Sequence, residues 1–459
     1  MSAMRDVIVV GGGISGLVAA WRIRAAGRDA LVIEAEGEVG GNIRTYRDGD
    51  YVLERGPHSF MGGAEAIWRL LADLKMEDRA LAASAAADNR FVYRDGRLIP
   101  IPLSPGKFIA SPLLSARAKL RLMSEPFRKG GAKPNDTALE FFHRRFGVEA
   151  TTFLAGVFVS GIYAGDPARL GARAAFPKFW NFERDHGSMI RGSIKFMREK
   201  SKRLRAEGKT SRKGLYSFRE GLGFLATAVA REVGEANTVT NAPVEAMERI
   251  DGGWRVRAGG ADYEAKALVI AAPPHVAARL LAPIDAEAAG IASSIPMAPV
   301  AVVHLGGRIT PNLPSGFGAL IPRHYGIRTL GSLFASQLFP GRAPQGKFLN
   351  TNFIGGMFDP DALKLSDDDL IALAKADQKQ LMGLTEFDYA SVLRYTHAIP
   401  QLTPDHPERM AALAARVAAL PGLVLAGNYI TGVGVDHAVA SGYTAAAGIA
   451  SFFATTSGS

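Results

Sequence analysis

The segment 5–34 constrains the fold of this chain more than any other part of it. A β-branched run at 5–10 ends abruptly in glycine, a stretch with helical spacing of apolar residues follows, and a second buried strand is expected at 30–34. The turn after the first strand reads G-x-G-x-x-G and occupies 11–16. A glycine-rich turn between a buried strand and a helix predicts a β-α-β unit that holds a dinucleotide at the N-terminus of the helix.

The three motif glycines have different physical roles. Gly11 permits the tight turn, Gly13 lets the backbone approach a pyrophosphate, and Gly16 lets the helix pack closely on the strand. Glu34 stands at the end of the second strand, where a carboxylate can accept hydrogen bonds from both hydroxyls of a ribose and would repel a 2′-phosphate. We therefore expect contacts to the dinucleotide from Gly11, Gly12, Gly13, Ile14, Ser15, Gly16 and Glu34.

A second glycine turn favours a flavin over a nicotinamide cofactor. Residues 39–44 read Val-Gly-Gly-Asn-Ile-Arg, and Gly-Gly-x-x-Arg at this place is typical of flavoproteins of the amine-oxidase type. A rigid bend at 54–59 follows. Its His58 is interpreted as a flavin-facing or structural histidine rather than a general base, since the sequence places no acid beside it. The further cofactor contacts expected from these two segments are Gly41, Asn42, Arg44, Gly56, Pro57, His58 and Ser59.

The C-terminal segment repeats the order of elements seen at the N-terminus. A short buried strand at 423–426 leads into a glycine-broken loop and an alanine-rich helix from about 436 to 453. The N-terminus of such a helix, aimed at N1 and the C2 carbonyl of a flavin, would stabilise the negative charge that develops there when the ring is reduced. Strands are also expected at 244–257 and 261–272, and the second of these returns to the core.

These segments predict an α/β protein with mixed α+β inserts, in which a discontinuous Rossmann-like FAD-binding domain is interrupted by a substrate domain and a helical insert. The FAD-binding domain is expected to comprise 1–78, 224–275 and 412–459. The substrate domain is expected to comprise 79–104, 201–223 and 276–411, and the helical, basic, membrane-associating insert 105–200.

Composition removes several other classes of function. The chain has 459 residues and no cysteine, so disulfides, iron–sulfur clusters, cysteine nucleophiles and a cysteinyl link to FAD are excluded, and non-covalent FAD is expected. The nine histidines show no metal-ligand spacing, and no G-x-S-x-G or P-loop pattern occurs, which argues against a metal site and a hydrolase. Glycines at 11–13 interrupt the apolar run 7–21, so neither a signal peptide nor a membrane span is expected.

The positive charge of the chain is concentrated in one region. The formal net charge is +10, but residues 107–213 carry +14 and the rest of the chain carries −4. Apolar residues lie among the bases at 107–121, a pattern that suits an amphipathic surface on anionic lipid. A solvated basic face is the alternative, and nucleic-acid binding is disfavoured because no recognition module accompanies the charges.

Four further segments discriminate among flavoproteins: 160–167, 316–322, 329–340 and 398–401. With these segments and the flavin motifs, the chain resembles from end to end the protoporphyrinogen oxidase family, flavoenzymes of haem and chlorophyll synthesis within the amine-oxidase-like group. The resemblance adds Val244 to the cofactor contacts, through its backbone at the adenine. It also adds Asn428, Val433, Gly434 and Val435.

The same resemblance places Gly161 close to a porphyrinogen ring, with Leu320, Leu330 and Phe339 around it. A flat macrocycle is held mainly by apolar and aromatic surface, although Leu and Phe are more often plain core residues. Plant and animal members of the family hold a substrate propionate with an arginine after the strand that contains Tyr93. No arginine at 96–102 aligns cleanly with it, so the anchor is not assigned.

The activity implied by the resemblance is conversion of protoporphyrinogen IX to protoporphyrin IX. This six-electron oxidation would proceed by three hydride transfers to flavin N5, with O2 as the expected acceptor and no acid or base residue assigned. Coproporphyrinogen III oxidation, oxidation of an amine or a carotenoid, and a non-enzymatic dinucleotide-binding membrane adaptor remain as alternatives. The expected location is cytoplasmic and peripheral on the inner face of the membrane, and a homodimer is left open.

Overall fold

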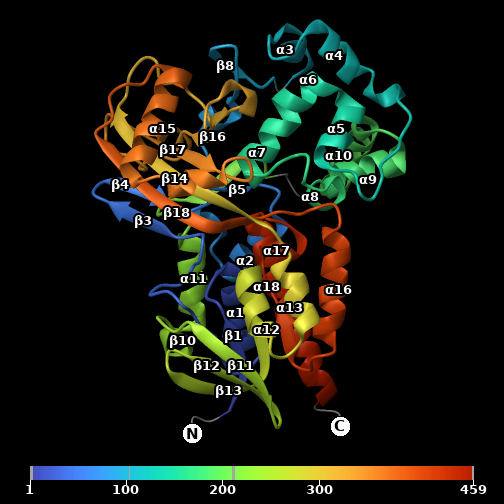
Figure 1. Cartoon of the computed structure of the whole chain (residues 1–459), viewed down its shortest axis with the longest axis vertical. Helices are drawn as coiled ribbons and strands as arrows, with labels where there is room; N and C mark the ends of the chain where they lie inside the picture. Colours follow the sequence, from blue (N-terminus) through green and yellow to red (C-terminus); the bar gives the residue numbers. More distant parts are fainter. Residues whose placement is uncertain (1–3, 103, 209–211, 457–459) are drawn as a thin grey trace.

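The computed structural model describes residues 4–102, 104–208 and 212–456, which form three bodies around two seven-stranded sheets. Figure 1 shows a nucleotide-binding type of α/β body at the bottom, with both chain termini, a second sheet at the upper left and a group of helices at the upper right. Helix α7 (Val157–Tyr163) lies where the helical group meets the second sheet.

The first sheet is built from segments that are far apart in the sequence. Its strand order is β10-β2-β1-β13-β12-β11, and β19 pairs with the end of β13. Strands β1, β2, β10, β13 and β19 are parallel where they pair, which is the arrangement of a Rossmann-like core. The bounds are β1 Arg5–Val10, β2 Ala30–Ile33, β10 Thr238–Val239, β11 Val244–Ile250, β12 Gly253–Ala258, β13 Ala261–Ile270 and β19 Leu423–Leu425.

Both faces of this sheet are covered, because successive side chains of a strand point to opposite sides. Val7 and Val9 of β1 belong to a core with one group of helices, and Ile8 and Val10 belong to a core with the other group. The first group is α1 (Ile14–Ala25), α2 (Glu65–Asp73), α11 (Phe224–Val233) and α18 (Val435–Thr456). The second is α12 (Pro274–Leu281), α13 (Ala286–Ser293) and α16 (His406–Ala418). The predicted discontinuous α/β fold is confirmed.

Helix α18 is long and apolar enough to cross a membrane by length and composition, and it is the one such helix in the described part of the chain. Its inner side is part of the core, since Val439, Ala445 and Ile449 are buried against the sheet and α1. The same helix therefore closes the nucleotide-binding body.

The second sheet has the order β18-β14-β17-β16-β15-β7-β8 and is antiparallel except for the β15–β7 pair. Helix α15 (Asp367–Met382) covers part of one face, where Leu370 and Ala374 pack on Ala301 and Val303. The bounds are β7 Arg90–Arg94, β8 Arg97–Pro100, β14 Met297–Arg308, β15 Gly318–Leu320, β16 Thr329–Leu333, β17 Lys347–Gly355 and β18 Tyr389–Pro400.

Smaller elements connect the two sheets. A hairpin of β3 (Thr45–Asp48) and β4 (Tyr51–Glu54) leaves the first body, and β9 pairs with both β5 and β6. The remaining bounds here are β5 Phe60–Met61, β6 Ala80–Ala82, β9 Leu215–Phe218, α14 Ala335–Leu338 and α17 Asn428–Thr431.

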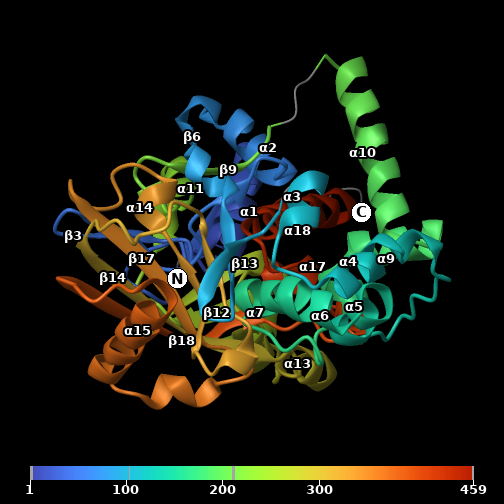
Figure 2. The ribbon, with the colours of Figure 1, turned by 90° about the horizontal axis from the view of Figure 1, so that it is seen from above.

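The helical group forms its own core around Phe141, Phe142 and Trp180. Its longest helix, α10, extends away from the rest of the molecule in the view from above (Figure 2). The bounds are α3 Pro105–Ala110, α4 Ala116–Met123, α5 Ala138–Phe146, α6 Val148–Ala150, a π-helical turn Thr151–Gly156, α8 Ala172–Ala175, α9 Pro177–His186 and α10 Met189–Ala206. A separate core explains how this group can be inserted between strands of the second sheet.

Candidate active site

The first glycine turn has the shape that a pyrophosphate requires. Gly11 has a φ of +105°, and a Cβ there would lie 2.7 Å from the carbonyl oxygen of Ala271. A Cβ on Gly16 would lie 2.0 Å from the carbonyl oxygen of Gly11, so helix and strand touch at this point. A Cβ on Gly13, in contrast, would meet no atom within 4 Å. The open side of the turn is therefore at Gly13, where the motif predicts that the phosphates bind.

The N-terminus of α1 offers hydrogen-bond donors at the same place. No side chain in the described residues caps this helix, whose N-cap residue is Gly13. The first amides of an uncapped helix need an acceptor, and the helix dipole favours an anionic one. The turn thus fits the pyrophosphate of a dinucleotide in both shape and charge.

The second glycine turn lies against the first. The amide of Gly40 donates to the carbonyl oxygen of Gly12 over 2.8 Å, and a Cβ on Gly41 would lie 3.3 Å from the Cα of Gly13. The buried guanidinium of Arg44 holds this turn, because its Nε donates to the Gly41 carbonyl over 3.0 Å and it forms ion pairs with Glu36 and Glu38. Arg44 therefore acts on the cofactor site through the shape of the loop.

Glu34 lies against the first glycine turn, where the sequence predicts the ribose. Its Oε2 accepts a hydrogen bond of 2.6 Å from the Gly12 amide, and its Oε1 accepts one of 2.9 Å from the Glu36 amide. The Ala242 amide donates to the Glu34 carbonyl over 2.9 Å, which brings the start of β11 with Val244 to the same place. This arrangement joins the first and second parts of the predicted FAD-binding domain.

The C-terminal segment packs against the first turn of α1. The Ser15 hydroxyl donates to the Ala438 carbonyl over 2.8 Å, which ties the first turn of α1 to α18. In the loop before α18, Val435 packs on the core of the first body and Val433 packs on the core of the helical group. Asn428 begins α17, and Gly434 immediately precedes α18. The loop 428–435 therefore lies between the nucleotide-binding body and the helices.

Residues 56–59 follow the β3–β4 hairpin, and His58 is buried. A Cβ on Gly56 would lie 2.6 Å from the carbonyl oxygen of Asn42, so this bend packs directly on the second glycine turn. Burial, followed by the neighbouring His304 and Arg342, holds the pKa of His58 well below its usual value. Its Nε2 has no hydrogen-bond partner in the described residues. A histidine in this state is neutral at pH 7 and a weak base.

A buried ion pair behind this bend was not predicted from the sequence. Oε1 of Glu54 lies 3.4 Å from a terminal guanidinium nitrogen of Arg342 and accepts a hydrogen bond of 2.8 Å from the Leu222 amide. The Thr45 hydroxyl donates to the other oxygen over 2.5 Å. Burial raises the pKa of Glu54 to about 7, although Arg342 opposes the shift. The one sequence signal was an acid that ends a run of strand-forming apolar residues at 51–53.

The predicted substrate residues fall into three packing groups. A Cβ on Gly161 would lie 2.2 Å from Cδ2 of Leu320, so the two residues are in direct contact where α7 meets β15. Leu330 is buried on the neighbouring strand β16 with Ala298 and Val300. Phe339 is buried in a separate cluster with Ala87 and Leu338. The structure thus brings Gly161 and Leu320 together, whereas Leu330 and Phe339 are buried in two other clusters.

Arg90 is a further candidate that the sequence analysis did not single out. Arg90 begins β7 and pairs with Gly318 of β15. Its side chain is on the same face of β7 as that of Val92, and Val92 packs in one cluster with Leu320. Its guanidinium lies 5.3 Å from the centre of the Phe317 ring. No hydrogen bond or ion pair of its side chain occurs in the described residues, whereas Arg94 pairs with Glu149. Arg90 is thus a half-buried cation free to bind an anionic ligand.

Two adjoining glycine turns and the uncapped N-terminus of α1 form a cradle of the kind expected in a flavin-dependent oxidoreductase. The model of the family described as flavin-containing amine oxidoreductase matches residues 14–450. The chain belongs to this family, and its cofactor is FAD.

Similar proteins of known name come from plants and bacteria. The chain is 30% identical to the chloroplastic protoporphyrinogen oxidase of Nicotiana tabacum, over 98% of this chain and 86% of the relative. It is 26% identical to the coproporphyrinogen III oxidase of Bacillus subtilis, over 96% of this chain and 97% of the relative. The crystal structure of a candidate protoporphyrinogen oxidase from Exiguobacterium sp. 255-15 shares the fold, with a TM-score of 0.82, 23% identity and coverage of 98% and 99% of the two chains.

Proposed function

We propose that this protein oxidises protoporphyrinogen IX to protoporphyrin IX with bound FAD. The observation that carries the proposal is the similarity to the tobacco protoporphyrinogen oxidase along nearly the whole chain, insert and second sheet included. When bound, FAD would supply at N5 the acceptor for two electrons, transferred as one hydride, in each of three successive oxidations, and O2 is the proposed final acceptor. The products belong to haem or chlorophyll biosynthesis.

The residues of this chain bind and orient the macrocycle. The contact between Gly161 and Leu320 supplies an apolar wall without a protruding side chain, which suits a flat ring. Arg90, on the same side of the sheet, supplies a cation for a propionate of the substrate. With His58 neutral and buried, positioning of the ring contributes more to catalysis than a strong base does.

Anaerobic mixing with protoporphyrinogen IX tests the reaction. The visible absorbance of the flavin is expected to bleach and, on admission of air, to recover while porphyrin fluorescence rises. Flavin that stays oxidised in the presence of excess substrate would contradict the proposal. The Arg90→Ala variant is expected to raise KM roughly tenfold or more with a smaller change in kcat, because the loss of a charge-assisted contact costs about 1.5–3 kcal/mol.

Oxidation of coproporphyrinogen III is the second candidate. The relative from Bacillus subtilis carries that name, and the cationic region 107–213 would suit a substrate with four carboxylates. Paired turnover assays with the two porphyrinogens separate the candidates, since the ratio of kcat/KM reports the preference directly.

We also propose that the enzyme binds peripherally to an anionic membrane through the helical insert, on the cytoplasmic face. Four large apolar side chains are exposed in its first part, between residues 105 and 130: Ile109 (63%), Leu120 (70%), Met123 (57%) and Phe127 (84%). They occur within the cationic part of the chain, the combination expected of an interfacial surface. The binding of purified enzyme to sedimenting vesicles measures this association, and light scattering in solution decides whether the enzyme is a homodimer.

A further inference from the structure

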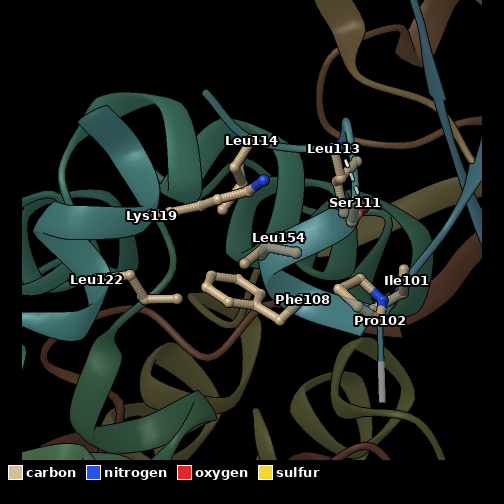
Figure 3. A pocket seen from close by; sticks show the side chains of 9 residues that line it. All are labelled: Ile101, Pro102, Phe108, Ser111, Leu113, Leu114, Lys119, Leu122 and Leu154. Carbon is tan, nitrogen blue, oxygen red and sulfur yellow. Dashed lines mark hydrogen bonds between the residues drawn. The ribbon is translucent and has the colours of Figure 1, made fainter. Parts of the chain in front are cut away.

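An apolar cavity of about 180 Å³ lies inside the helical insert, away from the glycine cradle. Its walls come from α3, α4, the segment that leaves β8 and the π-helical turn before α7 (Figure 3). The lining residues are Ile101, Pro102, Phe108, Ser111, Leu113, Leu114, Lys119, Leu122 and Leu154. Seven of the nine are aliphatic, aromatic or proline side chains, so the cavity offers hardly any polar partner to water.

The size and lining of the cavity fit one hydrocarbon chain. If each methylene occupies about 30 Å³, comparable to one water molecule in the liquid, about six methylenes can enter. A tetrapyrrole cannot, because pockets for ligands of drug size are larger, about 300–1,000 Å³.

The rim of the cavity is cationic and selects the head group. Residues 107–124 contain no acid, and Lys107, Arg117 and Lys119 follow one another along α3 and α4. The Lys119 ammonium lies at the cavity and donates a hydrogen bond of 2.6 Å to the carbonyl oxygen of Ile109. Within the described residues, Lys119 forms no ion pair. Its remaining donors are available to a phosphate.

Exposed apolar side chains surround the same cavity on the outside. Ile109 follows Phe108 near the end of α3, and Leu120 and Met123 lie on α4 beside Lys119 and Leu122. Apolar side chains of this size are normally buried. If the insert rests on a membrane, these side chains are buried among the lipid acyl chains. A chain that enters the cavity would therefore come from the bilayer on which the insert rests.

We propose that this cavity takes up one acyl chain of an anionic phospholipid, whose phosphate binds Lys119. The inference rests on the membrane association proposed above and goes beyond it, because an interfacial surface alone needs no cavity. Chain and head group are recognised together, so the site selects anionic over zwitterionic phospholipid.

Photo-crosslinking of the complete FAD-loaded enzyme tests this site. Vesicles of phosphatidylglycerol that carry a diazirine in one acyl chain are irradiated with the enzyme, and the labelled residues are mapped by mass spectrometry. We expect label on the lining residues Phe108, Leu113, Leu122 and Leu154, and severalfold less label from the phosphatidylcholine analogue.

Two matched pairs of variants separate the cavity from the surface. Leu122→Trp fills the cavity and is expected to reduce labelling of its other lining residues at least fivefold, whereas Leu120→Trp on the exposed side of the same helix should leave it unchanged. Lys119→Glu is expected to weaken the preference for phosphatidylglycerol by roughly thirtyfold, since one cation near an anionic surface is worth about 1 kcal/mol and reversal doubles the effect. Lys379→Glu on α15 is its control. Unchanged flavin absorbance and melting temperature show that each variant is folded.

Three results would overturn the proposal. Enzyme that sediments with vesicles but is labelled on Ile109, Leu120 and Met123 alone would leave membrane association intact and exclude the chain site. Enzyme that does not sediment with anionic vesicles would remove both proposals, while the porphyrinogen assay would still report the oxidase activity separately. Labelling by a free diazirine fatty acid in solution, without labelling from phosphatidylglycerol vesicles, would identify a free fatty acid as the ligand instead.

Discussion

Among single residues, the motif glycines differ in the reason why each position must lack a side chain. Gly16 has no room for a Cβ within the protein itself, because the carbonyl oxygen of Gly11 lies 2.0 Å from the position a Cβ would take. A Cβ on Gly13 would meet no atom within 4 Å, and the residue has an ordinary extended conformation, with a φ of −69°. The protein itself would therefore accommodate a side chain at Gly13, and we expect that glycine is needed there for the bound FAD.

This difference can be measured. Gly16→Ala is expected to lower the stability of the FAD-free protein by about 1–3 kcal/mol, the usual cost of overpacking. Gly13→Ala should change it by about 1 kcal/mol or less, yet reduce FAD affinity roughly tenfold or more. Melting temperature without FAD and flavin retained after dialysis are the two measurements. Gly290→Ala, at an open position in α13, is the control, and equal effects at Gly13 and Gly16 would contradict the assignment.

Glu54 gives the stability of the protein a specific dependence on pH. Burial raises its pKa in the native state to about 7, whereas in the unfolded chain it titrates near about 4.3. Between these values the native state binds more protons than the unfolded state, so the Glu54 contribution to the free energy of unfolding falls as pH rises. Glu54→Gln cannot titrate and should lack this fall.

Urea unfolding at several pH values between 4.5 and 7.5 measures the effect of Glu54. Across this range we expect the stability of the wild type to fall by about 1–3 kcal/mol relative to Glu54→Gln. The exposed Glu65 serves for comparison, and Glu65→Gln should keep the wild-type pH dependence. An identical pH dependence in the wild type and in Glu54→Gln would show that Glu54 is already ionised in the native state at low pH.

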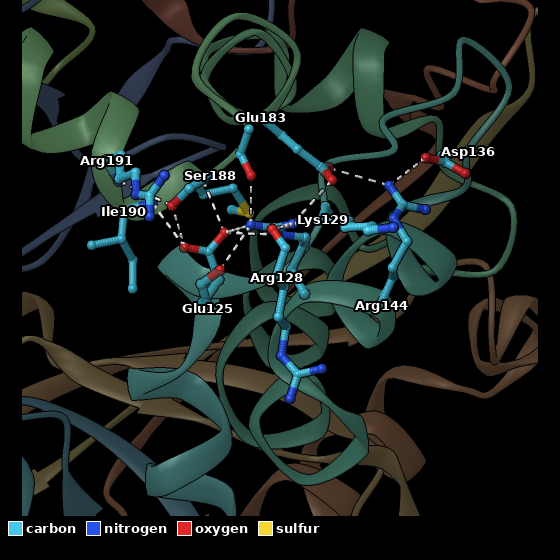
Figure 4. A network of polar contacts seen from close by, with 12 residues as sticks. Glu125, Arg128, Lys129, Asp136, Arg144, Glu183, Ser188, Ile190 and Arg191 are labelled. Atoms are coloured by element: carbon cyan, nitrogen blue, oxygen red, sulfur yellow. Dashed lines mark hydrogen bonds and ion pairs between the residues drawn. The ribbon is translucent and has the colours of Figure 1, made fainter.

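Among the helices, those of the insert are held together by an ion network with a buried centre. The side chains of Arg145, Glu125 and Glu183 are fully buried, and Arg145 pairs with both acids. The Ser188 hydroxyl and the Met189 amide also donate to Glu125, so α10 begins on this network (Figure 4). Although burial opposes it, hydrogen bonds from Ser188 and Arg145 lower the pKa of Glu125.

Removal of the central cation should unfold the insert before the rest of the molecule. Arg145→Met leaves the buried Glu125 without a counter-charge, whereas Glu183 keeps its ion pair with Arg144, and removal of one partner of a buried pair costs about 3–5 kcal/mol. Limited proteolysis should then cut within 107–206 while flavin absorbance persists, because the glycine cradle belongs to a different core. The exposed Arg117 provides the control Arg117→Met. Simultaneous loss of flavin would show that the two cores fold as one unit.

Elements of the first sheet were predictable because buried parallel strands are continuous apolar runs. Strands β1, β2 and β19 begin and end within one residue of their predicted positions. Contacts between distant segments were not predictable in this way. The parallel pairing of β7 with β15 leaves no local pattern, and it is this pairing that places Arg90 beside Gly318. The Glu54–Arg342 pair likewise joins residues 288 positions apart.

In the molecule as a whole, the cationic part of the sequence is also a separate part of the fold. The region 107–213 carries +14 and the remainder −4, and the helices of this region form the group that stands apart in Figure 1. Helix α10 alone holds seven bases and one acid, and it also exposes Ile194, Phe196 and Met197. Such a dipolar molecule should approach an anionic surface with its insert first.

The salt dependence of vesicle binding tests this orientation. Binding to phosphatidylglycerol vesicles is expected to weaken severalfold between 50 and 500 mM salt, because screening shortens the range of the attraction to a few ångströms. The double variant Arg198→Gln/Lys202→Gln removes two exposed charges of α10 and should weaken binding about tenfold or more, at about 1 kcal/mol per charge. Lys375→Gln/Lys379→Gln removes the same charge from α15, on the other body, and should have little effect. Equal losses from the two double variants would mean that net charge, and not the orientation of the insert, governs the association.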